Sequence, residues 1–561
     1  MSVNFLSFAD VLRNNGKALA EKTAFVCGDS RRSFGEIDSR INRLCAGLVG
    51  LGLKIGDRVA ILSRNRIEYF ETYGAAKAGL IVVPLNWRLA REELRHPLAD
   101  SAPSVVIAES TFAPSIDAIR DQLPSVRAFI AIDKPPPGWL SYEALLASAA
   151  DRDPKLELAP EQVLCLIYTS GTTGVPKGVM LGSAGLMANC RAAAEDVLKL
   201  TVSDVALTAM PMFHVGGMWY HLFPAFASGN TTVICAEFSP EDILETLERE
   251  QVTHTHLVPT MLHALVHHPE VGRFALGSLR CIFYAASVIQ VPLLRLAMVT
   301  FAHSDFIQSY GSTESGIVTV LRAEEHRRAA QNSAYEHLLG SCGRPVAGVE
   351  VRLQPFEGSS ETGDIVVRGP QCMLGYWNNP IATAAVMKDG WMTMGDIGCF
   401  DPEGYLYIVD RRNDMIVTGG ENVYPNEVEA QLCEDPAIAE VAVFALPDPK
   451  WVERVTAIVV LKPGFTATGA DIIARARSKL ADYKCPKEVI FAQELPRTAT
   501  GKVLRKELRQ RYGNRPATTG DQRAGAGATL ASPRGLIPRE GSLSQSSAAI
   551  YRRQICEDSD Q

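Results

Sequence analysis

VLCLIYTSGTTGVPKG, from Val163 to Gly178, is the stretch around which the rest of the chain can be ordered. It begins with an apolar run that is typical of a buried strand and continues into a loop rich in glycine, serine and threonine. Glycine lets a backbone curl, its N–H groups and the hydroxyls donate to phosphate oxygens, and Lys177 adds positive charge. A strand followed by such a loop predicts a phosphate site at the edge of an α/β sheet.

This loop differs from the P-loop of nucleoside triphosphatases. The P-loop motif GxxxxGK[ST] places lysine directly after glycine and a hydroxyl residue after lysine. In this chain Val175 and Pro176 separate Gly174 from Lys177, and Gly178 follows. The remaining alternative for the stretch is a surface loop without a ligand.

The regions on either side of this loop alternate between strand and helix patterns. A helix is predicted over 67–79, and strands are predicted over 58–62, 81–85, 104–108, 204–210, 231–237, 252–258 and 279–285. This alternation predicts a large N-terminal α/β domain of stacked mixed and parallel sheets covered by helices. Closely spaced strands with glycine-rich turns over 343–407 predict a small antiparallel, β-barrel-like subdomain within it.

A polar junction, DRRND at 410–414, separates this domain from a second mixed pattern. Helices over 426–434 and 470–483 and strands over 440–446, 454–461 and 488–492 predict a smaller α+β domain. From Asn514 the sequence is rich in Gly, Ser, Ala, Pro and Arg and has no sustained period, which favours disorder. We therefore expect domains over 1–410 and 411–513, the second of them mobile, and a disordered tail over 514–561.

Composition limits the class of protein. The chain has 561 residues, a formal net charge of -7, 47% hydrophobic and 21% charged residues, as in ordinary globular proteins. This balance gives no general attraction to nucleic acid. No apolar run reaches the roughly 18 residues of a membrane span, and the N-terminus lacks the apolar segment of a secretion signal.

The twelve cysteines lie far apart, from Cys27 to Cys556, and no pair has metal or redox spacing. They predict reduced thiols in a cytoplasmic protein. Peripheral membrane contact and a homodimer are left open.

Three further motifs follow the loop in order: QSYGSTE at 308–314, GWMTMGD at 390–396 and PRTATGK at 496–502. Together with YTSGTTGVPKG at 168–178, they resemble the signature motifs of the adenylate-forming superfamily of acyl-CoA synthetases, amino-acid adenylation domains and luciferases. The resemblance covers about residues 5–512. It implies attack of a carboxylate on the α-phosphate of ATP, which requires neutralisation of phosphate charge above all.

The resemblance implies a role for each motif. Glu314 would hold Mg²⁺ beside the triphosphate with the hydroxyl of Thr169. Tyr310 would stack on adenine, with the run from Ala285 to Ser287 opposite, and Asp396 would bind the ribose together with Arg411. The residues implied to bind ATP or AMP are Thr169, Ser170, Gly171, Thr172, Thr173, Gly174, Lys177, Ala285, Gln308, Ser309, Tyr310, Gly311, Thr313, Asp396 and Arg411.

Lys502 resembles the family lysine that swings in from the second domain to the carboxylate and the α-phosphate. The junction at 410–414 then becomes a hinge, in which Asn413 replaces the usual Asp or Lys. The loop at 419–422 resembles the one that lines the pantetheine tunnel of coenzyme A. The residues implied to bind the acyl group or CoA are His214, Gly217, Trp219, Ala286, Gly419, Gly420 and Glu421.

The branch of the superfamily is indicated at PMFHVGG, 211–217. Members that activate amino acids place Asp after the Phe, whereas this chain has His214, as in fatty-acyl and aryl CoA ligases. His214 would lie where the acyl site meets the nucleotide. The segments near Trp219, Thr260 and Ala285 are mostly apolar, so medium or long fatty acids are expected first and aryl or alicyclic acids next.

Three residues depart from the family pattern: Met394, Ser183 and Val452. None of them removes a charged catalytic group, although the branched Val452 replaces a usual glycine. We therefore predict an acyl-CoA synthetase that uses ATP, Mg²⁺ and coenzyme A. An acyl-AMP ligase that loads a carrier protein and a nucleotide-binding pseudoenzyme are the two alternatives.

Overall fold

The computed structural model describes residues 7–169, 175–355, 362–412, 414–418, 421–448, 451–477, 479–498 and 501–513. The chain divides into two compact units, the first being Met1–Val351 with Val367–Met392. The second comprises Arg352–Val366 and the chain from Thr393 onward. The domain boundary at 410/411 stays a prediction, and the predicted tail at 514–561 lies outside the described residues.

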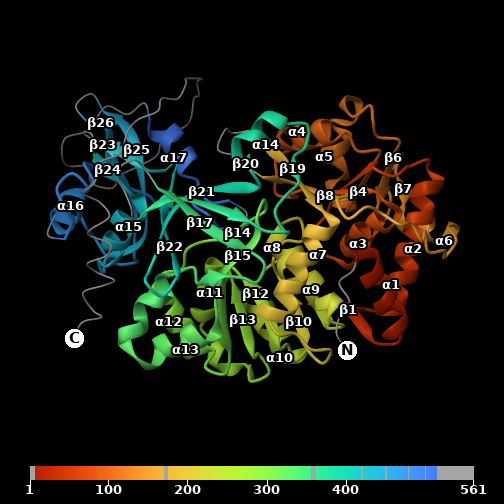
Figure 1. Ribbon diagram of the computed structural model, residues 1–561, viewed down its shortest axis with the longest axis horizontal. Coiled ribbons are helices and arrows are strands. Elements are labelled where there is room, and N and C mark those ends of the chain that lie inside the picture. The colour runs from red at the N-terminus through yellow and green to blue at the C-terminus, as the bar shows by residue number, and fades with distance from the viewer. Residues whose placement is uncertain are drawn as a thin grey trace. The chain divides into compact units, whose positions relative to one another are not determined.

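The first unit contains a nine-stranded sheet in the order β16-β15-β14-β13-β12-β10-β11-β1-β2, parallel from β14 to β1. Its strands are β1 (Thr23–Cys27), β2 (Ser30–Ser33), β10 (Val205–Thr208), β11 (Thr231–Ile234), β12 (His254–Leu257), β13 (Cys281–Tyr284), β14 (Asp305–Ser312), β15 (Gly316–Leu321) and β16 (Arg344–Pro345). Helices α10 (Pro240–Arg249), α11 (Pro259–Val266) and α12 (Val291–Thr300) lie along it (Figure 1). Their apolar side chains are buried in a core with those of its strands. The parallel α/β layers predicted from the strand and helix rhythm are thereby confirmed.

An eight-stranded sheet of the same unit runs in the order β19-β9-β8-β4-β3-β5-β6-β7. Its strands are β3 (Arg58–Leu62), β4 (Ile81–Pro84), β5 (Val105–Ala108), β6 (Ala128–Ala131), β7 (Leu140–Ser141), β8 (Val163–Thr169), β9 (Lys177–Gly182) and β19 (Gly375–Tyr376). Helices α4 (Arg91–Ser101) and α5 (Ala113–Asp117) contribute to its core. The phosphate loop follows the carboxyl end of β8, the edge at which ligands bind in open α/β sheets.

The remaining strands form two smaller sheets. One sheet contains β17 (Glu350–Pro355), β18 (Gly363–Arg368), β21 (Trp391–Phe400) and β22 (Leu406–Arg411), with β21 and β22 paired antiparallel, and it lies in the region where closely spaced strands are predicted. In the second unit, β23 (Ile416–Thr418), β24 (Glu421–Val423), β25 (Ile438–Asp448), β26 (Val452–Leu461) and β27 (Glu488–Phe491) form a sheet. Its helices are α15 (Pro425–Cys433), α16 (Gly469–Arg477) and α17 (Arg505–Tyr512), which gives the predicted α+β composition.

None of the helices described is long and apolar enough to cross a membrane. The eleven cysteines among the described residues all carry free thiols. Cys556 lies outside them.

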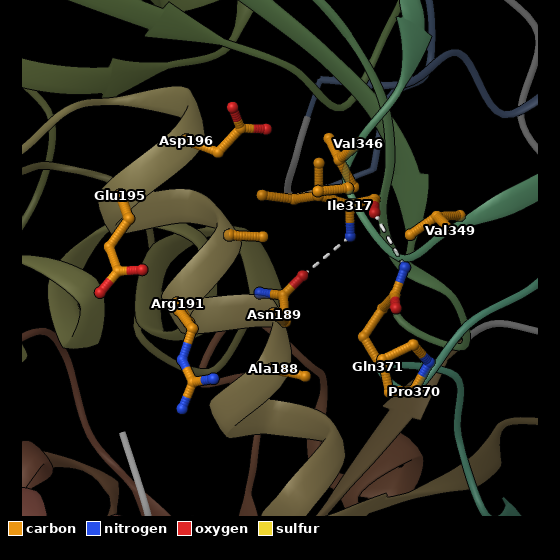
Figure 2. A pocket seen from close by; sticks show the side chains of 12 residues that line it. Ala188, Asn189, Arg191, Glu195, Asp196, Ile317, Val346, Val349, Pro370 and Gln371 are labelled. Carbon is orange, nitrogen blue, oxygen red and sulfur yellow. Dashed lines mark hydrogen bonds between the residues drawn. The ribbon is translucent and has the colours of Figure 1, made fainter. Parts of the chain in front are cut away.

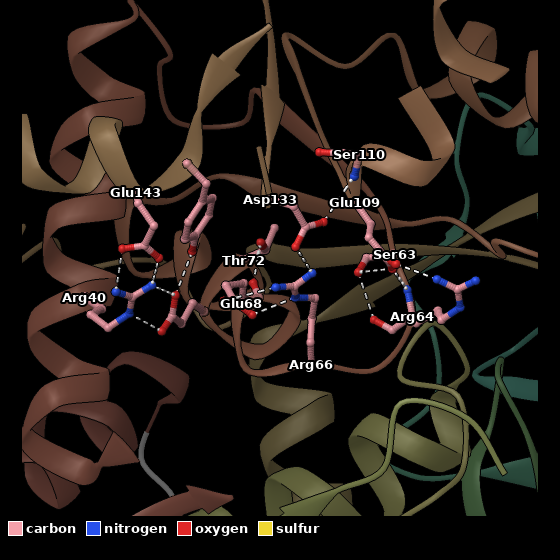
Figure 3. Close-up of polar contacts among 12 residues, drawn as sticks. Arg40, Ser63, Arg64, Arg66, Glu68, Thr72, Glu109, Ser110, Asp133 and Glu143 are labelled. Atoms are coloured by element: carbon pink, nitrogen blue, oxygen red, sulfur yellow. Dashed lines mark hydrogen bonds and ion pairs between the residues drawn. The ribbon is translucent and has the colours of Figure 1, made fainter. Parts of the chain in front are cut away.

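A buried ion pair joins α2 (Phe34–Gly50) to α3 (Ile67–Tyr73) in the first unit (Figure 3). The guanidinium of Arg40 lies 2.6 Å from Oε1 of Glu71, whose side chain has 0% exposure, and it also contacts Glu143 at 2.6 Å. Tyr142 donates its hydroxyl to Glu71 at 2.9 Å. Burial raises the pKa of the Glu71 carboxyl, and Arg40 opposes this effect.

Arg40→Met is therefore expected to lower the free energy of unfolding by about 3–5 kcal/mol, because it leaves the Glu71 carboxylate buried without its partner. Urea denaturation of the purified protein measures the loss. Arg31→Met is the matched control, since the Arg31 side chain is 57% exposed where it meets Glu250 and its pair should contribute about 1 kcal/mol or less. Equal losses in both variants would contradict the assignment.

Candidate functional site

The two ends of the phosphate loop lie opposite each other. Strands β8 and β9 pair antiparallel, and Thr169 faces Lys177 across this pair. Tyr168 donates its hydroxyl to Asp100 at 2.7 Å, and Nε2 of His96 lies 2.8 Å from the carbonyl oxygen of Pro176. The loop residues predicted to bind phosphate lie outside the described residues: Ser170, Gly171, Thr172, Thr173 and Gly174.

The motif QSYGSTE occupies β14 and the tight turn that leads into β15. Ser312 and Ser315 hold this turn reciprocally, because the hydroxyl of each accepts the backbone N–H of the other, at 2.9 and 3.2 Å. A bulge lies between Tyr310 and Gly311, and a Cβ on Gly311 would meet the carbonyl oxygen of Gly316 at 2.0 Å. The hairpin carries all the motif residues predicted to bind nucleotide: Gln308, Ser309, Tyr310, Gly311 and Thr313.

Glu314 sits in this turn, and its carboxylate faces the end of β8. Its Oε1 accepts hydrogen bonds from the hydroxyls of Thr169 and Tyr376, each at 3.2 Å. The ammonium of Lys177 lies 5.0 Å from the centre of the Tyr376 ring. The fold therefore brings Thr169 and Glu314 together from two different sheets, with Lys177 beside them.

Side chains behind the hairpin hold β15 through Ile317. Asn189 of α7 (Ser183–Arg191) accepts its backbone N–H at 2.9 Å, and the amide of Gln371 donates to its carbonyl at 3.1 Å. These side chains line a cavity of about 250 Å³. Figure 2 shows the two bonds, with Arg191 and Glu195 on the same helical stretch as Asn189. The amide side chains of Asn189 and Gln371 thereby fix the strand that follows Glu314.

The predicted adenine wall follows β13, the neighbour of β14. Tyr284 is the register partner of Gln308, so Ala285 and Ala286 lie beside the start of the QSYGSTE motif. Ala285 is buried, and Ala286 has φ +77°, a conformation that L-residues other than Asn and Asp rarely adopt. Backbone strain of this kind concentrates at functional sites.

His214 precedes the short helix α8 (Val215–Gly217), and its Nδ1 accepts the backbone N–H of Gly216 at 3.1 Å. Gly217 packs without room for a side chain, because a Cβ would lie 2.3 Å from the carbonyl oxygen of Pro211. Trp219 is fully buried, and its ring packs against Tyr73 at 5.3 Å. The structure thus gives Gly217 and Trp219 packing roles, and their part in acyl binding stays a prediction.

In the second unit, Asp396 of β21 is the register partner of Arg411 of β22. The backbones of the two residues predicted to bind the ribose therefore lie opposite each other on neighbouring strands. Lys502 lies in a tight turn, where its N–H donates to the hydroxyl of Thr498 at 3.1 Å and its carbonyl accepts from the N–H of the same residue at 2.7 Å. Of the predicted CoA loop, Gly419 and Gly420 lie outside the described residues, and Glu421 begins β24.

Val452, which replaces a glycine of the family pattern, has φ +69° and is 73% exposed. This is the left-handed region in which a branched residue is strained. Glycine adopts this backbone conformation without strain, which accounts for the glycine of the family pattern at this position. Nothing in the structure explains Met394.

Two contributors to the site were missed at the level of sequence. Tyr376 donates to Glu314, and His256, buried on β12, lies 3.0 Å through Nδ1 from the carbonyl oxygen of Gly216. Tyr376 is separated from Glu314 by 62 residues, and no local motif marks it. The two closely spaced histidines of HTHL at 254–257 were the feature of the sequence that could have marked His256 as a candidate.

Comparison with known proteins identifies the family. The model of AMP-binding enzymes matches residues 12–377, and that of their C-terminal domain matches 427–502. An indoleacetate–CoA ligase from Aromatoleum aromaticum is 39% identical over 87% of this chain and 95% of its own length. A long-chain-fatty-acid–CoA ligase, FadD13 of Mycobacterium tuberculosis, is 35% identical over 86% of this chain and 94% of its own.

Among solved structures, the anthranilate CoA ligase AuaEII in complex with anthranoyl-AMP is similar with a TM-score of 0.79 and 28% identity. The match covers 89% of this chain and 96% of that chain. The two family-model matches include the motifs at 168–178, 308–314 and 496–502, together with the Thr169–Glu314 contact. The chain is a member of the AMP-binding enzyme family, within the acyl-CoA synthetases of the adenylate-forming superfamily.

Proposed function

We propose that the protein activates a carboxylic acid with ATP and transfers the acyl group to coenzyme A. The observation that carries this proposal is the arrangement of Glu314 with the hydroxyls of Thr169 and Tyr376, with Lys177 at the other end of the phosphate loop. Oxygen ligands and a cation at the ends of a phosphate loop suit a triphosphate. This arrangement can neutralise the charge that builds up during attack at phosphorus.

The reaction has two balanced steps. An oxygen of the substrate carboxylate bonds to the α-phosphorus of ATP, and the bond to pyrophosphate breaks. The CoA thiolate then bonds to the acyl carbonyl carbon, and AMP leaves with the electron pair of the C–O bond. Lys502 supplies positive charge to the first step, Asp396 and Arg411 hold the ribose, and Tyr310 stacks on the adenine.

The oxygen donors at Glu314 fit a magnesium ion. A carboxylate and a hydroxyl, 3.2 Å apart, are hard ligands of the kind that Mg²⁺ takes alongside phosphate oxygens. Glu314 and Thr169 would hold the ion. When bound, it would offset negative charge on the phosphates.

The acceptor is free coenzyme A rather than a carrier protein. This choice is supported by the GGEN sequence at 419–422 and by the absence of an obvious insertion over 340–370 of the sequence. The free thiols of the described cysteines support a cytoplasmic location.

For the acid itself, we place aromatic acids first and medium or long-chain fatty acids second. Aromatic acids are supported by the similar indoleacetate and anthranilate ligases. Fatty acids are supported by the mostly apolar pocket segments and by the similarity to FadD13.

ATP–pyrophosphate exchange across a panel of carboxylic acids tests the first step, and thioester formation tests the second. We expect exchange that depends on the acid, followed by acyl-CoA formation with free CoA. Exchange without transfer to CoA, but with transfer to a phosphopantetheinyl carrier protein, would favour an acyl-AMP ligase. Nucleotide binding without exchange for any acid would indicate a pseudoenzyme.

His214→Asp is expected to lower acid activation by about 30-fold or more without creating activity on amino acids. A carboxylate at this position repels the substrate carboxylate and the phosphates, by a few kcal/mol at an effective dielectric near 20. Exchange rates of wild type and variant with aromatic, fatty and amino acids measure the effect. His267→Asp, on the exposed part of the first unit, is the control. If His214→Asp keeps full activity, His214 does not face the reacting carboxylate of the substrate.

A further inference from the structure

Three histidines form a buried cluster directly behind the His214 loop. His221 belongs to the π-helix η5 (Met218–Leu222), whereas His254 and His256 belong to β12. Each is at most 1% exposed. The ring of His221 lies 4.8 Å from that of His254 and 6.1 Å from that of His256. We call these three residues the imidazole cluster.

Hydrogen bonds fix where the protons of the first two rings lie. Asn230 donates its amide N–H to the carbonyl of Thr201, so its Oδ1 faces Nε2 of His254 at 3.0 Å and requires an N–H there. Nδ1 of His254 is consequently a lone-pair acceptor and takes its hydrogen bond from Nε2–H of His221 at 2.9 Å. Nδ1 of His221 is left as a bare acceptor.

The same reasoning applies to His256. Its Nδ1 lies 3.0 Å from the carbonyl of Gly216, so Nδ1 carries the proton and Nε2 is bare. Burial lowers the pKa of His256 to about 4, so the ring stays neutral at neutral pH. Thr208, its register partner on β10, has a buried hydroxyl beside it. Among the described residues, none bonds to Nδ1 of His221, Nε2 of His256 or the hydroxyl of Thr208.

The cluster lies next to the reacting end assigned to His214. A Cβ on Gly216 would be 3.2 Å from Cε1 of His256 and 3.3 Å from Nδ1 of His214, so the two rings flank one point of the loop. The His256 ring also packs against the Phe283 ring at 4.6 Å. A buried polar atom left unpaired destabilises a fold unless water or a ligand pairs with it. Bare acceptors beside aromatic rings thus suit a flat ligand that carries an N–H or O–H.

We infer that His256, with Thr208 beside it, accepts a hydrogen bond from the body of the substrate, and that the acid is an aromatic acid with a ring N–H or O–H. This inference rests on the proposed acid–CoA ligase function. A saturated fatty acid has no such donor and would leave the acceptors unpaired. The residues thereby determine specificity and take no part in the chemical step.

The test compares acids that differ in the donor alone. The pairs are indole-3-acetate with 1-benzothiophene-3-acetate, and 4-hydroxycinnamate with 4-fluorocinnamate, with decanoate as a fatty acid. We expect kcat/KM in pyrophosphate exchange to be at least about 10-fold higher for the donor-bearing member of one pair, because sites built around a hydrogen bond reject analogues that lack it. Decanoate should be the poorer substrate.

Two substitutions of His256 separate its two nitrogens. His256→Asn keeps an N–H near the Gly216 carbonyl but removes the Nε2 acceptor, so the preference should fall to within about 3-fold. His256→Gln keeps an acceptor near Nε2 and should retain the preference. If His256→Asn folds poorly, Thr208→Val, which conserves the shape of the side chain, should also reduce the preference for the donor-bearing acid. His267→Asn, at an exposed histidine, should change nothing.

Each other outcome is decisive. If His256→Asn lowers kcat/KM equally for both members of a pair, the acceptors pair with a buried water, and the inference is wrong. Activation of decanoate alone, or of both members equally by the wild type, also overturns it and leaves the ligase function standing. Absence of exchange and thioester formation across a broad acid panel overturns the proposed function itself.

Discussion

Lys502→Ala is expected to abolish formation of the acyl-adenylate and to leave thioester formation from supplied acyl-AMP largely intact. The positive charge of Lys502 is needed only while the α-phosphate is attacked, because the second step breaks no bond at phosphorus. Loss of a preorganised charge contact in a transition state costs on the order of 3 kcal/mol, or at least about 100-fold in rate. Pyrophosphate exchange and single-turnover thioester formation measure the two steps separately.

Lys506→Ala is a suitable control for this experiment. Lys506 is exposed on α17, four residues beyond the Thr498–Lys502 turn. Its substitution removes the same charge from the same unit. Its activity should match that of the wild type in both steps. An equal loss of both half-reactions in Lys502→Ala would refute the division of labour between them.

Glu314→Gln is expected to reduce adenylate formation by at least about 100-fold while the fold stays intact. Glutamine conserves the shape and can still accept from Thr169 and Tyr376, but it removes the negative charge that suits a cation beside the triphosphate. The Mg²⁺ concentration needed for half-maximal exchange should rise at the same time. Exchange at a series of Mg²⁺ concentrations measures both effects.

Glu324→Gln, at an exposed position of α13 (Ala323–Gln331), is the corresponding control. Melting temperatures of both variants should equal that of the wild type, which separates chemistry from stability. If Glu314→Gln retains activity within about 3-fold at low Mg²⁺, Glu314 does not act on the phosphates, and the turn holds it for structural reasons.

Much of the fold is predictable from sequence because apolar strand patterns have a local cause. The run at 58–62 forms β3 with these same bounds, and the run at 281–284 lies within its predicted strand. The helix expected over 67–79 forms as α3 followed by a 3₁₀ segment, Gly74–Ala78. A Cβ on Gly74 would meet Ile41 at 2.6 Å, so contact with α2 influences this segment, and such a contact has no periodic signal.

The site is predictable only where a motif marks it. The motifs contain Thr169 and Glu314, and the structure brings them within hydrogen-bond distance, although their catalytic role stays a prediction. Tyr376 and His256 reach the site through pairing of β19 with β9 and of β12 with β10. Strand order is a long-range property, so local patterns gave no reason to select these two residues. The imidazole protons likewise depend on Asn230, which is distant in sequence.

The π-helical turn at Met218–Leu222 restricts how this enzyme can diverge. A π turn arises when a helix carries one more residue than an α-helix needs. Deleting one residue there would restore α geometry and rotate everything on one side of the deletion by about 100° relative to the other. The hydrogen bond between His221 and His254 would be lost, as would the bond from the Asn189 amide to the carbonyl of Trp219. Relatives with a different acid preference are therefore expected to differ by insertions and deletions in this turn as well as by substitutions.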